Sequence, residues 1–153
     1  MRKIVSLFSI LALVCIVITG CNKQVDEKLC RIEIADSNHN IVAKLENQSQ
    51  SDVTGFFDES DWKETNISTD NLIPEYIISV YQEKTKTVIQ TENAGEYEKI
   101  MEYVTFENSD VIKVSIGGDV VGDIVSDDIL DEYYTASSDF FSKIKAAVSI
   151  ETA

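Results

Sequence analysis

The chain has 153 residues, of which 44% are apolar and 26% are charged. Its 27 acidic residues outnumber the 13 basic ones, so the formal net charge is −14 at pH 7. This length suits one domain rather than two, and the scarcity of Gly and Pro excludes collagen-like and Pro-rich chains. Because proteins bind nucleic acids through Lys and Arg, the acidity also argues against a nucleic-acid partner.

The first twenty residues differ from the rest of the chain. Arg2 and Lys3 form a basic start, and residues 4–18 follow as an almost continuous apolar stretch. A basic start, about 7–15 apolar residues and small residues at the exit are typical of a secretory signal peptide. A membrane-spanning signal anchor is the alternative, but it needs about 20 apolar residues, and polar residues begin at Asn22. We therefore interpret residues 1–20 as a signal peptide.

The end of this segment, Ile18-Thr19-Gly20-Cys21, resembles the lipobox of bacterial lipoproteins. The resemblance implies that a diacylglyceryl group is transferred to the sulfur of Cys21 and that the chain is cleaved between Gly20 and Cys21. It covers residues 1–21 only and assigns nothing to the domain that follows. Two acyl chains give stable membrane attachment, whereas one gives only marginal attachment. We expect a lipid-anchored protein on the extracytoplasmic face of the bacterial membrane, in a host with one membrane or two.

Three segments follow from this interpretation: the signal peptide 1–20, the lipidated Cys21 with a tether to residue 28, and one small domain at 29–153. Removing residues 1–20 leaves 133 residues with a net charge of −16, because Arg2 and Lys3 are the only charged residues removed. A tether of seven residues spans roughly 25 Å when fully extended. An anionic bilayer is expected to repel so acidic a domain.

The cysteines leave no intramolecular disulfide in the mature protein. Cys15 departs with the signal peptide and Cys21 forms the thioether, so Cys30 is the remaining thiol. Cys30 alternates with Ile32 and Ile34, which predicts a small core residue on a strand. A reactive thiol is the alternative, but it needs a neighbouring base, and the single histidine, His39, lies in a polar turn.

The first half of the domain reads as a hairpin, a short helix and a loop. Residues 29–35 and 41–45 alternate in polarity around a turn cluster at 36–40, which predicts the hairpin. Within residues 47–61, apolar residues at helical spacing predict a short helix that starts near Ser49 or Ser51 and is capped by either hydroxyl. Residues 63–75 read as a loop that ends at Pro74.

The second half predicts more strands and a final helix. Residues 76–82 and 87–91 read as a second hairpin. Residues 93–106 fit either a helix or a strand, and the sequence leaves both open. Alternation predicts a strand at 111–116, a tight turn at Gly117-Gly118, a return strand at 120–125 and a short strand at 130–135. The helix 138–149 is predicted by a serine cap, an acidic first turn, later lysines and one apolar face.

These elements predict an α+β fold. Consecutive hairpins indicate a mainly antiparallel sheet, and about two helices, including the C-terminal helix 138–149, are expected to pack on one of its faces. The aromatic residues Trp62, Phe56 and Phe57, or the pair Tyr133-Tyr134, either line a groove or belong to the core; the core is the commoner role of such residues.

Support for catalysis is poor. One histidine and the few cysteines do not match common metal-site spacings, and no nucleophile-elbow motif is present. The glycines at 117, 118 and 122 do not form a phosphate loop, since Asp119 and Asp123 would repel the anion. The sequence therefore predicts no enzyme activity, no metal site and no cofactor.

The most distinctive local feature is an acidic stretch, because no Lys or Arg occurs between Lys113 and Lys143. Its acidic residues are Asp119, Asp123, Asp127, Asp128, Asp131, Glu132 and Asp139. A solvated face that keeps the protein soluble is one interpretation. A weak calcium site or a contact for a cationic partner is the other, since Ca²⁺ takes six to eight oxygen ligands, although no EF-hand loop is present.

Together these observations favour a non-catalytic binding or interaction module, attached to the membrane through a lipid anchor and directed at an envelope protein or a cationic ligand. A surface inhibitor or immunity-type protein that acts on an envelope enzyme or toxin is an alternative. A hydrolase is a third, less supported alternative.

Overall fold

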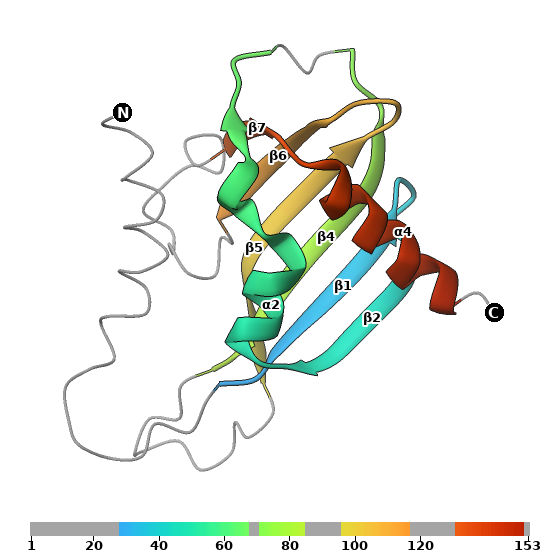
Figure 1. Cartoon of the computed structure of the whole chain (residues 1–153). Coiled ribbons are helices and arrows are strands. Elements are labelled where there is room, and N and C mark those ends of the chain that lie inside the picture. The colour runs from blue at the N-terminus through green and yellow to red at the C-terminus, as the bar shows by residue number, and fades with distance from the viewer. Residues whose placement is uncertain (1–27, 68–70, 85–95, 117–130, 152–153) are drawn as a thin grey trace.

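One antiparallel sheet forms the centre of the computed structural model (Figure 1), which describes residues 28–67, 71–84, 96–116 and 131–151. Within these ranges its seven strands are β1 (Cys30–Asp36), β2 (Ile41–Gln48), β3 (Lys63–Glu64), β4 (Pro74–Glu83), β5 (Tyr97–Phe106), β6 (Val111–Ile116) and β7 (Asp131–Thr135). The helical elements are α2 (Gln50–Phe57), the short 3₁₀ helix η1 (Glu59–Asp61) and α4 (Ser138–Glu151).

The strand order is β2-β1-β4-β5-β6-β7-β3, and every neighbouring pair is antiparallel. The chain leaves β2 at one edge, passes through α2 and η1, and adds β3 at the other edge beside β7. The predicted α+β class with an antiparallel sheet and a C-terminal helix is confirmed. Because β3 pairs with β7, the segment that follows α2 lies beside β7 at this edge of the sheet.

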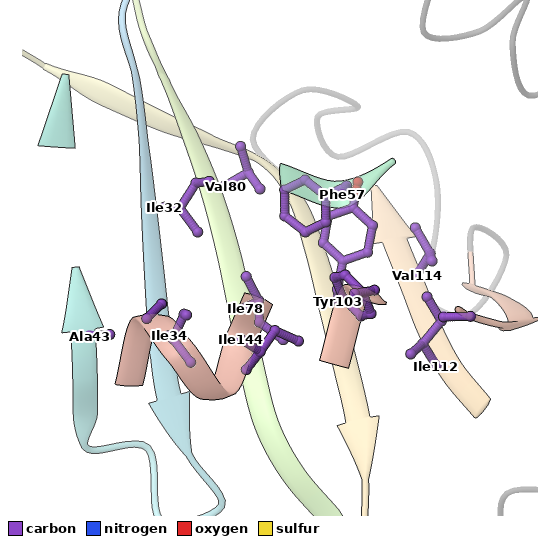
Figure 2. Packing of buried hydrophobic residues seen from close by; sticks show 13 residues of the cluster. Ile32, Ile34, Ala43, Phe57, Ile78, Val80, Tyr103, Ile112, Val114 and Ile144 are labelled. Carbon is purple, nitrogen blue, oxygen red and sulfur yellow. The ribbon is translucent and has the colours of Figure 1, made fainter. Parts of the chain in front are cut away.

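Helices α2 and α4 lie on the same face of the sheet, and the hydrophobic core fills the space between the two layers (Figure 1). Figure 2 shows Phe57 of α2 and Ile144 of α4 among strand side chains of this cluster. The strand residues that it labels are Ile32, Ile34, Ala43, Ile78, Val80, Tyr103, Ile112 and Val114. Complete burial of one such aliphatic side chain contributes about 1.5–3 kcal/mol, so this cluster is the main source of stability.

Helix α2 begins with a capping box, in which the side chains of Ser49 and Asp52 each accept a hydrogen bond from the backbone N–H of the other residue. Ser49 Oγ accepts from the Asp52 backbone N–H at 3.1 Å, and the Asp52 carboxylate accepts from the Ser49 N–H at 3.0 Å. The helix ends at Asp58, whose φ of 40° is left-handed and whose N–H donates to the Thr54 carbonyl. The predicted helix and its Ser49 cap are therefore confirmed.

The segment 93–106, which the sequence left open, contains the strand β5 and no helix in its described part. Strand β5 pairs with β4 on one side and with β6 on the other. These two ladders satisfy the backbone groups that a helix would satisfy internally. Of the second predicted hairpin, β4 is confirmed, whereas residues 87–91 lie outside the described residues.

Other predictions are confirmed with shifted boundaries. The first hairpin is β1 and β2, with Cys30 buried at its start as the alternation predicts. The final helix runs two residues further than predicted, to Glu151. The loop prediction for 63–75 is wrong at both ends, because Lys63–Glu64 pairs with β7 and Pro74 already belongs to β4. The turn 117–118 and the return strand 120–125 lie outside the described residues.

Candidate functional site

The predicted site residues are only partly covered by the described ranges. Those outside them are Gly20, Cys21, Asp119, Asp123, Asp127 and Asp128. Asp131 is described, and its carboxylate contacts Lys113 Nζ at 2.5 Å and accepts from Ser115 Oγ at 2.6 Å. Burial alone would lower the pKa of Lys113, but the hydrogen bond and the charge of Asp131 outweigh it and raise this pKa. The negative charge of Asp131 is thus already balanced by Lys113 of the neighbouring strand.

Glu132 does not join Asp131, because successive strand residues point to opposite faces of a sheet. Glu132 accepts a hydrogen bond from the hydroxyl of Tyr134, on the side of the sheet that carries the helices. Asp139 pairs with Lys143 at 2.8 Å. The three described members of the acidic stretch therefore lie in three separate environments, and no metal-binding group of His, Cys, Asp or Glu occurs among the described residues.

Ion pairs cover the face of the sheet that is opposite the helices. Glu33 contacts Arg31 at 3.1 Å and Lys44 at 3.7 Å, and Glu102 contacts Lys99 at 2.8 Å. The guanidinium of Arg31 also lies over the rings of two tyrosines, Tyr81 at 4.6 Å and Tyr97 at 4.8 Å. The carboxylates of Glu33 and Glu102 are therefore compensated by lysine or arginine within the domain.

A different arrangement occurs where η1 and β3 meet β7. We call it the Trp62 site, and it consists of Glu59, Trp62, Glu64, Tyr103, Glu132 and Tyr134. Trp62 packs edge-on against Tyr103 at 5.9 Å and lies 6.3 Å from the ring of Tyr134. Trp62 and Tyr134 are half-buried, whereas Tyr103 is buried and stacks on Phe57 at 4.1 Å. The site is thus an extension of the core that reaches the surface.

Within the ranges that the structure describes, the carboxylates of the Trp62 site have no cationic partner. Glu59 is half-buried and accepts one hydrogen bond, from the Tyr103 hydroxyl at 2.9 Å. Burial raises the pKa of the Glu59 carboxyl, and this hydrogen bond opposes the rise only in part. Among the described residues, no Lys or Arg forms an ion pair with Glu59, Glu64 or Glu132.

The surroundings of the Tyr134 hydroxyl, at the centre of the site, are negatively charged. Its pKa is well above the ordinary value, chiefly because of burial and then because of the hydrogen bond to Glu132. The charges of Glu132, Glu64 and Glu59 all raise it further. Three carboxylates therefore act on one point, and the same negative potential would stabilise a positive charge placed there.

The indole N–H of Trp62 is buried and has no hydrogen-bond acceptor among the described residues. An unpaired buried donor costs about 1–3 kcal/mol. Arg31 Nε is a milder case, because it makes no hydrogen bond but still lies 3.1 Å from a carboxylate oxygen of Glu33. The Trp62 site thus contains one buried donor, the indole N–H, for which the described residues provide no acceptor.

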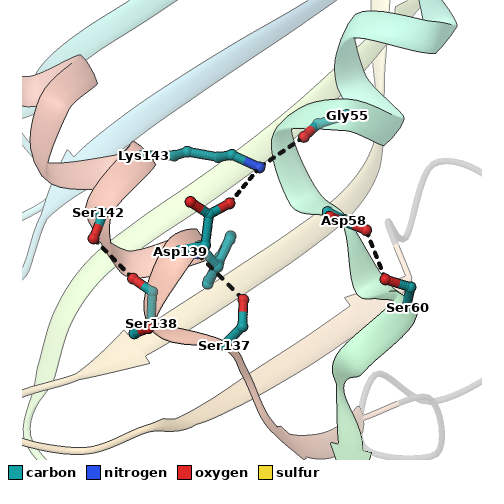
Figure 3. Close-up of polar contacts among 9 residues, drawn as sticks. Gly55, Asp58, Ser60, Ser137, Ser138, Asp139, Ser142 and Lys143 are labelled. Carbon is teal, nitrogen blue, oxygen red and sulfur yellow. Dashed lines mark hydrogen bonds and ion pairs between the residues drawn. The ribbon is translucent and has the colours of Figure 1, made fainter.

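The position of Glu59 is set by the end of α2 and by a lysine of α4. Lys143 Nζ donates to the Gly55 carbonyl at 3.0 Å and contacts Asp139 at 2.8 Å, so it ties the last turn of α2 to α4 (Figure 3). The left-handed Asp58 then turns the chain into η1, and Ser60 Oγ donates to the Asp58 carboxylate at 2.8 Å. These contacts hold the turn that precedes Glu59, and so they fix the position of Glu59.

Sequence reasoning found part of this site. It named Trp62 and Tyr134 as groove or core residues, and the structure places both partly buried against the core cluster. It named Glu132 for the acidic stretch rather than for its contact with Tyr134. It missed Glu59 and Glu64, and the only local signal is that these two acids flank Trp62 in the sequence.

Comparison of the chain with protein-family models, with curated proteins and with solved structures finds no match in any of the three. In the part of the chain that the structure describes, no helix is both long enough and apolar enough to span a membrane. Functional arguments about this protein therefore rest on its own residues. The Trp62 site combines aromatic rings with carboxylates that have no counter-charge among the described residues.

Proposed function

We propose that this protein is a lipid-anchored extracytoplasmic binding module, without catalytic activity, that takes up a cationic side chain of an envelope protein at the Trp62 site. The observation that supports the proposal is the contrast between two groups of carboxylates. Glu33 and Glu102, on the face opposite the helices, have lysine or arginine partners. Glu59, Glu64 and Glu132 have none among the described residues, although they lie beside aromatic rings.

A Lys or Arg side chain of a partner fits these groups in two ways. Its charge offsets the cost of leaving Glu59 half-buried without a counter-charge, since charged groups removed from water are stable only when paired. Its ammonium or guanidinium group also packs against aromatic faces, an interaction of about 0.5–2 kcal/mol depending on exposure. Trp62 and Tyr134 are the partly exposed rings that can supply these faces.

The lipid anchor is the second part of the proposal and is supported by the sequence alone. Arg2 and Lys3, the apolar stretch 4–18 and the lipobox-like end at Gly20 and Cys21 are its basis. An anchored domain with so high a negative charge attracts basic proteins more strongly than acidic ones at low salt. Anchor and site are therefore consistent with the same class of partner.

Trp62 is the only tryptophan of the chain, so its fluorescence reports on the site directly. The purified mature domain is titrated at fixed ionic strength with a lysine-rich peptide and with the same peptide in which glutamine replaces lysine. We expect a saturable fluorescence change with the first peptide only. We expect Glu132→Gln to weaken its binding by about tenfold, because a paired charge is lost.

Glu102→Gln is the matched control, because it removes the same charge from the opposite face. It should leave the peptide affinity nearly unchanged. Equal weakening by both substitutions would mean that the peptide responds to net charge alone, and it would contradict a site at Trp62. A fluorescence change of equal size with the glutamine peptide would contradict recognition of a cation.

A further inference from the structure

The start of β1 and the Trp62 site lie at opposite corners of the sheet. The strand register carries Cys30 through β4 to Glu98 of β5, and it carries Tyr134 through β6 to Thr105 of β5. Glu98 and Thr105 are seven positions apart, and four strand spacings separate β1 from β7. At about 3.3 Å per residue and about 4.8 Å per strand, Cys30 and Tyr134 are on the order of 30 Å apart.

Charges are distributed unequally between these two corners. At the β1 corner, backbone hydrogen bonds join Glu83 to Leu29 and Lys84 to Glu96. Among the described residues, four basic residues lie at this corner, which are Lys28, Arg31, Lys84 and Lys99, together with five acids, which are Glu33, Glu83, Glu96, Glu98 and Glu102. Within the same described ranges, the other corner has two lysines, Lys63 and Lys113, and six acids, which are Asp58, Glu59, Asp61, Glu64, Asp131 and Glu132. The charge is therefore nearly balanced at the first corner and strongly negative at the second.

The geometry points to a fixed orientation of the domain on the membrane, and this inference rests on the proposed anchor at Cys21. The tether joins the bilayer to the balanced corner at Cys30, and an anionic bilayer repels the acidic corner. The Trp62 site then faces away from the lipid. Its partner is therefore a cationic segment of a protein that lies beyond the bilayer surface, and the amine headgroups of the supporting membrane are out of its reach.

Energy transfer from tryptophan to labelled lipid measures this orientation. The lipidated mature protein, purified from bacterial membranes, is reconstituted in phosphatidylethanolamine–phosphatidylglycerol vesicles that carry dansyl-labelled headgroups. Trp62 is the sole donor in the natural chain. In the reference variant, Trp62→Phe with Tyr97→Trp, the sole donor lies at the β1 corner. A second reference, Trp62→Phe with Gln48→Trp, uses the position that pairs with Cys30.

We expect energy transfer from Trp62 to the labelled lipid to be much weaker than the transfer from either reference tryptophan. Salt at about 1 M, where the Debye length falls to about 3 Å, should narrow the difference. Transfer from Trp62 that equals or exceeds both references would overturn the orientation. Flotation of the vesicles separates this result from failure of the anchor, because a wild-type protein that does not float with the vesicles overturns the anchor and this inference together, and leaves the peptide-binding result unaffected.

Discussion

The hydroxyl of Tyr103, in the middle of β5, donates a hydrogen bond to the carboxylate of Glu59 in η1 at 2.9 Å. Among the described residues this is the only hydrogen bond that the Glu59 side chain receives. It joins the sheet to the segment that carries Trp62, and it couples a buried phenol to a half-buried carboxylate. Burial and the charge of Glu59 together raise the pKa of Tyr103 well above its ordinary value.

Replacing Tyr103 by phenylalanine tests this contact. Tyr103→Phe keeps the ring that stacks on Phe57 but leaves the Glu59 carboxylate without a donor. We expect the free energy of unfolding to fall by about 1–3 kcal/mol, because the half-buried carboxylate loses its hydrogen-bond partner. Urea denaturation at neutral pH measures the change. Tyr81→Phe is the control, since the Tyr81 hydroxyl makes no hydrogen bond among the described residues, and an equal loss in both variants would contradict a specific role of the Tyr103–Glu59 pair.

The raised pKa of Glu59 predicts a pH dependence of stability. Because the pKa is higher in the folded state, the folded protein binds more protons than the unfolded chain at pH values just above 4.5, the ordinary value. Stability contributed by this group is therefore complete below that value and is lost as the pH rises through the folded-state pKa. We expect Glu59→Gln to remove this part of the decline and to be relatively more stable at neutral pH.

Thermal melts of the wild type and the variant from about pH 4 to about pH 8 measure this difference. The exposed Glu107 provides the control substitution, Glu107→Gln. Parallel curves for wild type and Glu59→Gln would show that the carboxyl of Glu59 titrates alike in the folded and unfolded states, which contradicts the burial that the structure assigns to it.

The C-terminal helix should stabilise the domain through its buried face. Ile144 is 1% exposed and lies in the core cluster, so Ile144→Ala is expected to cost about 2–5 kcal/mol. Alanine at Phe140, which is equally buried, should lower the stability by a similar amount, whereas alanine at the half-buried Phe141 should lower it less. Lys145→Ala, on the exposed side, is expected to stay within about 0.5 kcal/mol of the wild type. A melt of Ile144→Ala that matches the wild type would place α4 away from the sheet.

Gly55 offers a stabilising substitution. A Cβ added at this position in α2 meets no heavy atom within 4 Å, and the bond from Lys143 goes to the backbone carbonyl, which alanine keeps. Alanine also restricts the unfolded chain more than glycine does. We therefore expect Gly55→Ala to raise the free energy of unfolding by about 0.5–1 kcal/mol in urea denaturation. A loss of stability would contradict the helical conformation of residue 55.

The proposed lipid anchor has a direct test in living cells. Cys21→Ala removes the sulfur that we propose as the acceptor of the diacylglyceryl group, so we expect an unlipidated precursor or a shed form. Metabolic labelling with a palmitate analogue detects the lipid, and Cys30→Ala is the control because Cys30 is buried in β1. Label that persists in Cys21→Ala would contradict the interpretation of residues 18–21 as a lipobox.

Local patterns in the sequence were sufficient for the first hairpin, the capped helix α2 and the final helix α4. Alternation with period two and apolar spacing near 3.6 each state which side of an element faces the core. The segment that became β5 satisfied both patterns, so local information could not decide it. Its pairing with β4 and β6 decided it, and those partners include residues more than twenty positions away, such as Ile78 opposite Tyr103.

The candidate site depended still more on the tertiary structure. By itself, the sequence determined the strong acidity of the domain, the pattern at residues 18–21 that resembles a lipobox, and the aromatic residues Trp62 and Tyr134. Only the fold decided that Asp131 contacts Lys113, whereas Glu59, 44 positions before Tyr103, contacts a tyrosine and no described lysine. The physical reason is that burial and counter-charge belong to residues brought together across the sheet, and the spacing of neighbours along the chain does not encode which lysine reaches which carboxylate.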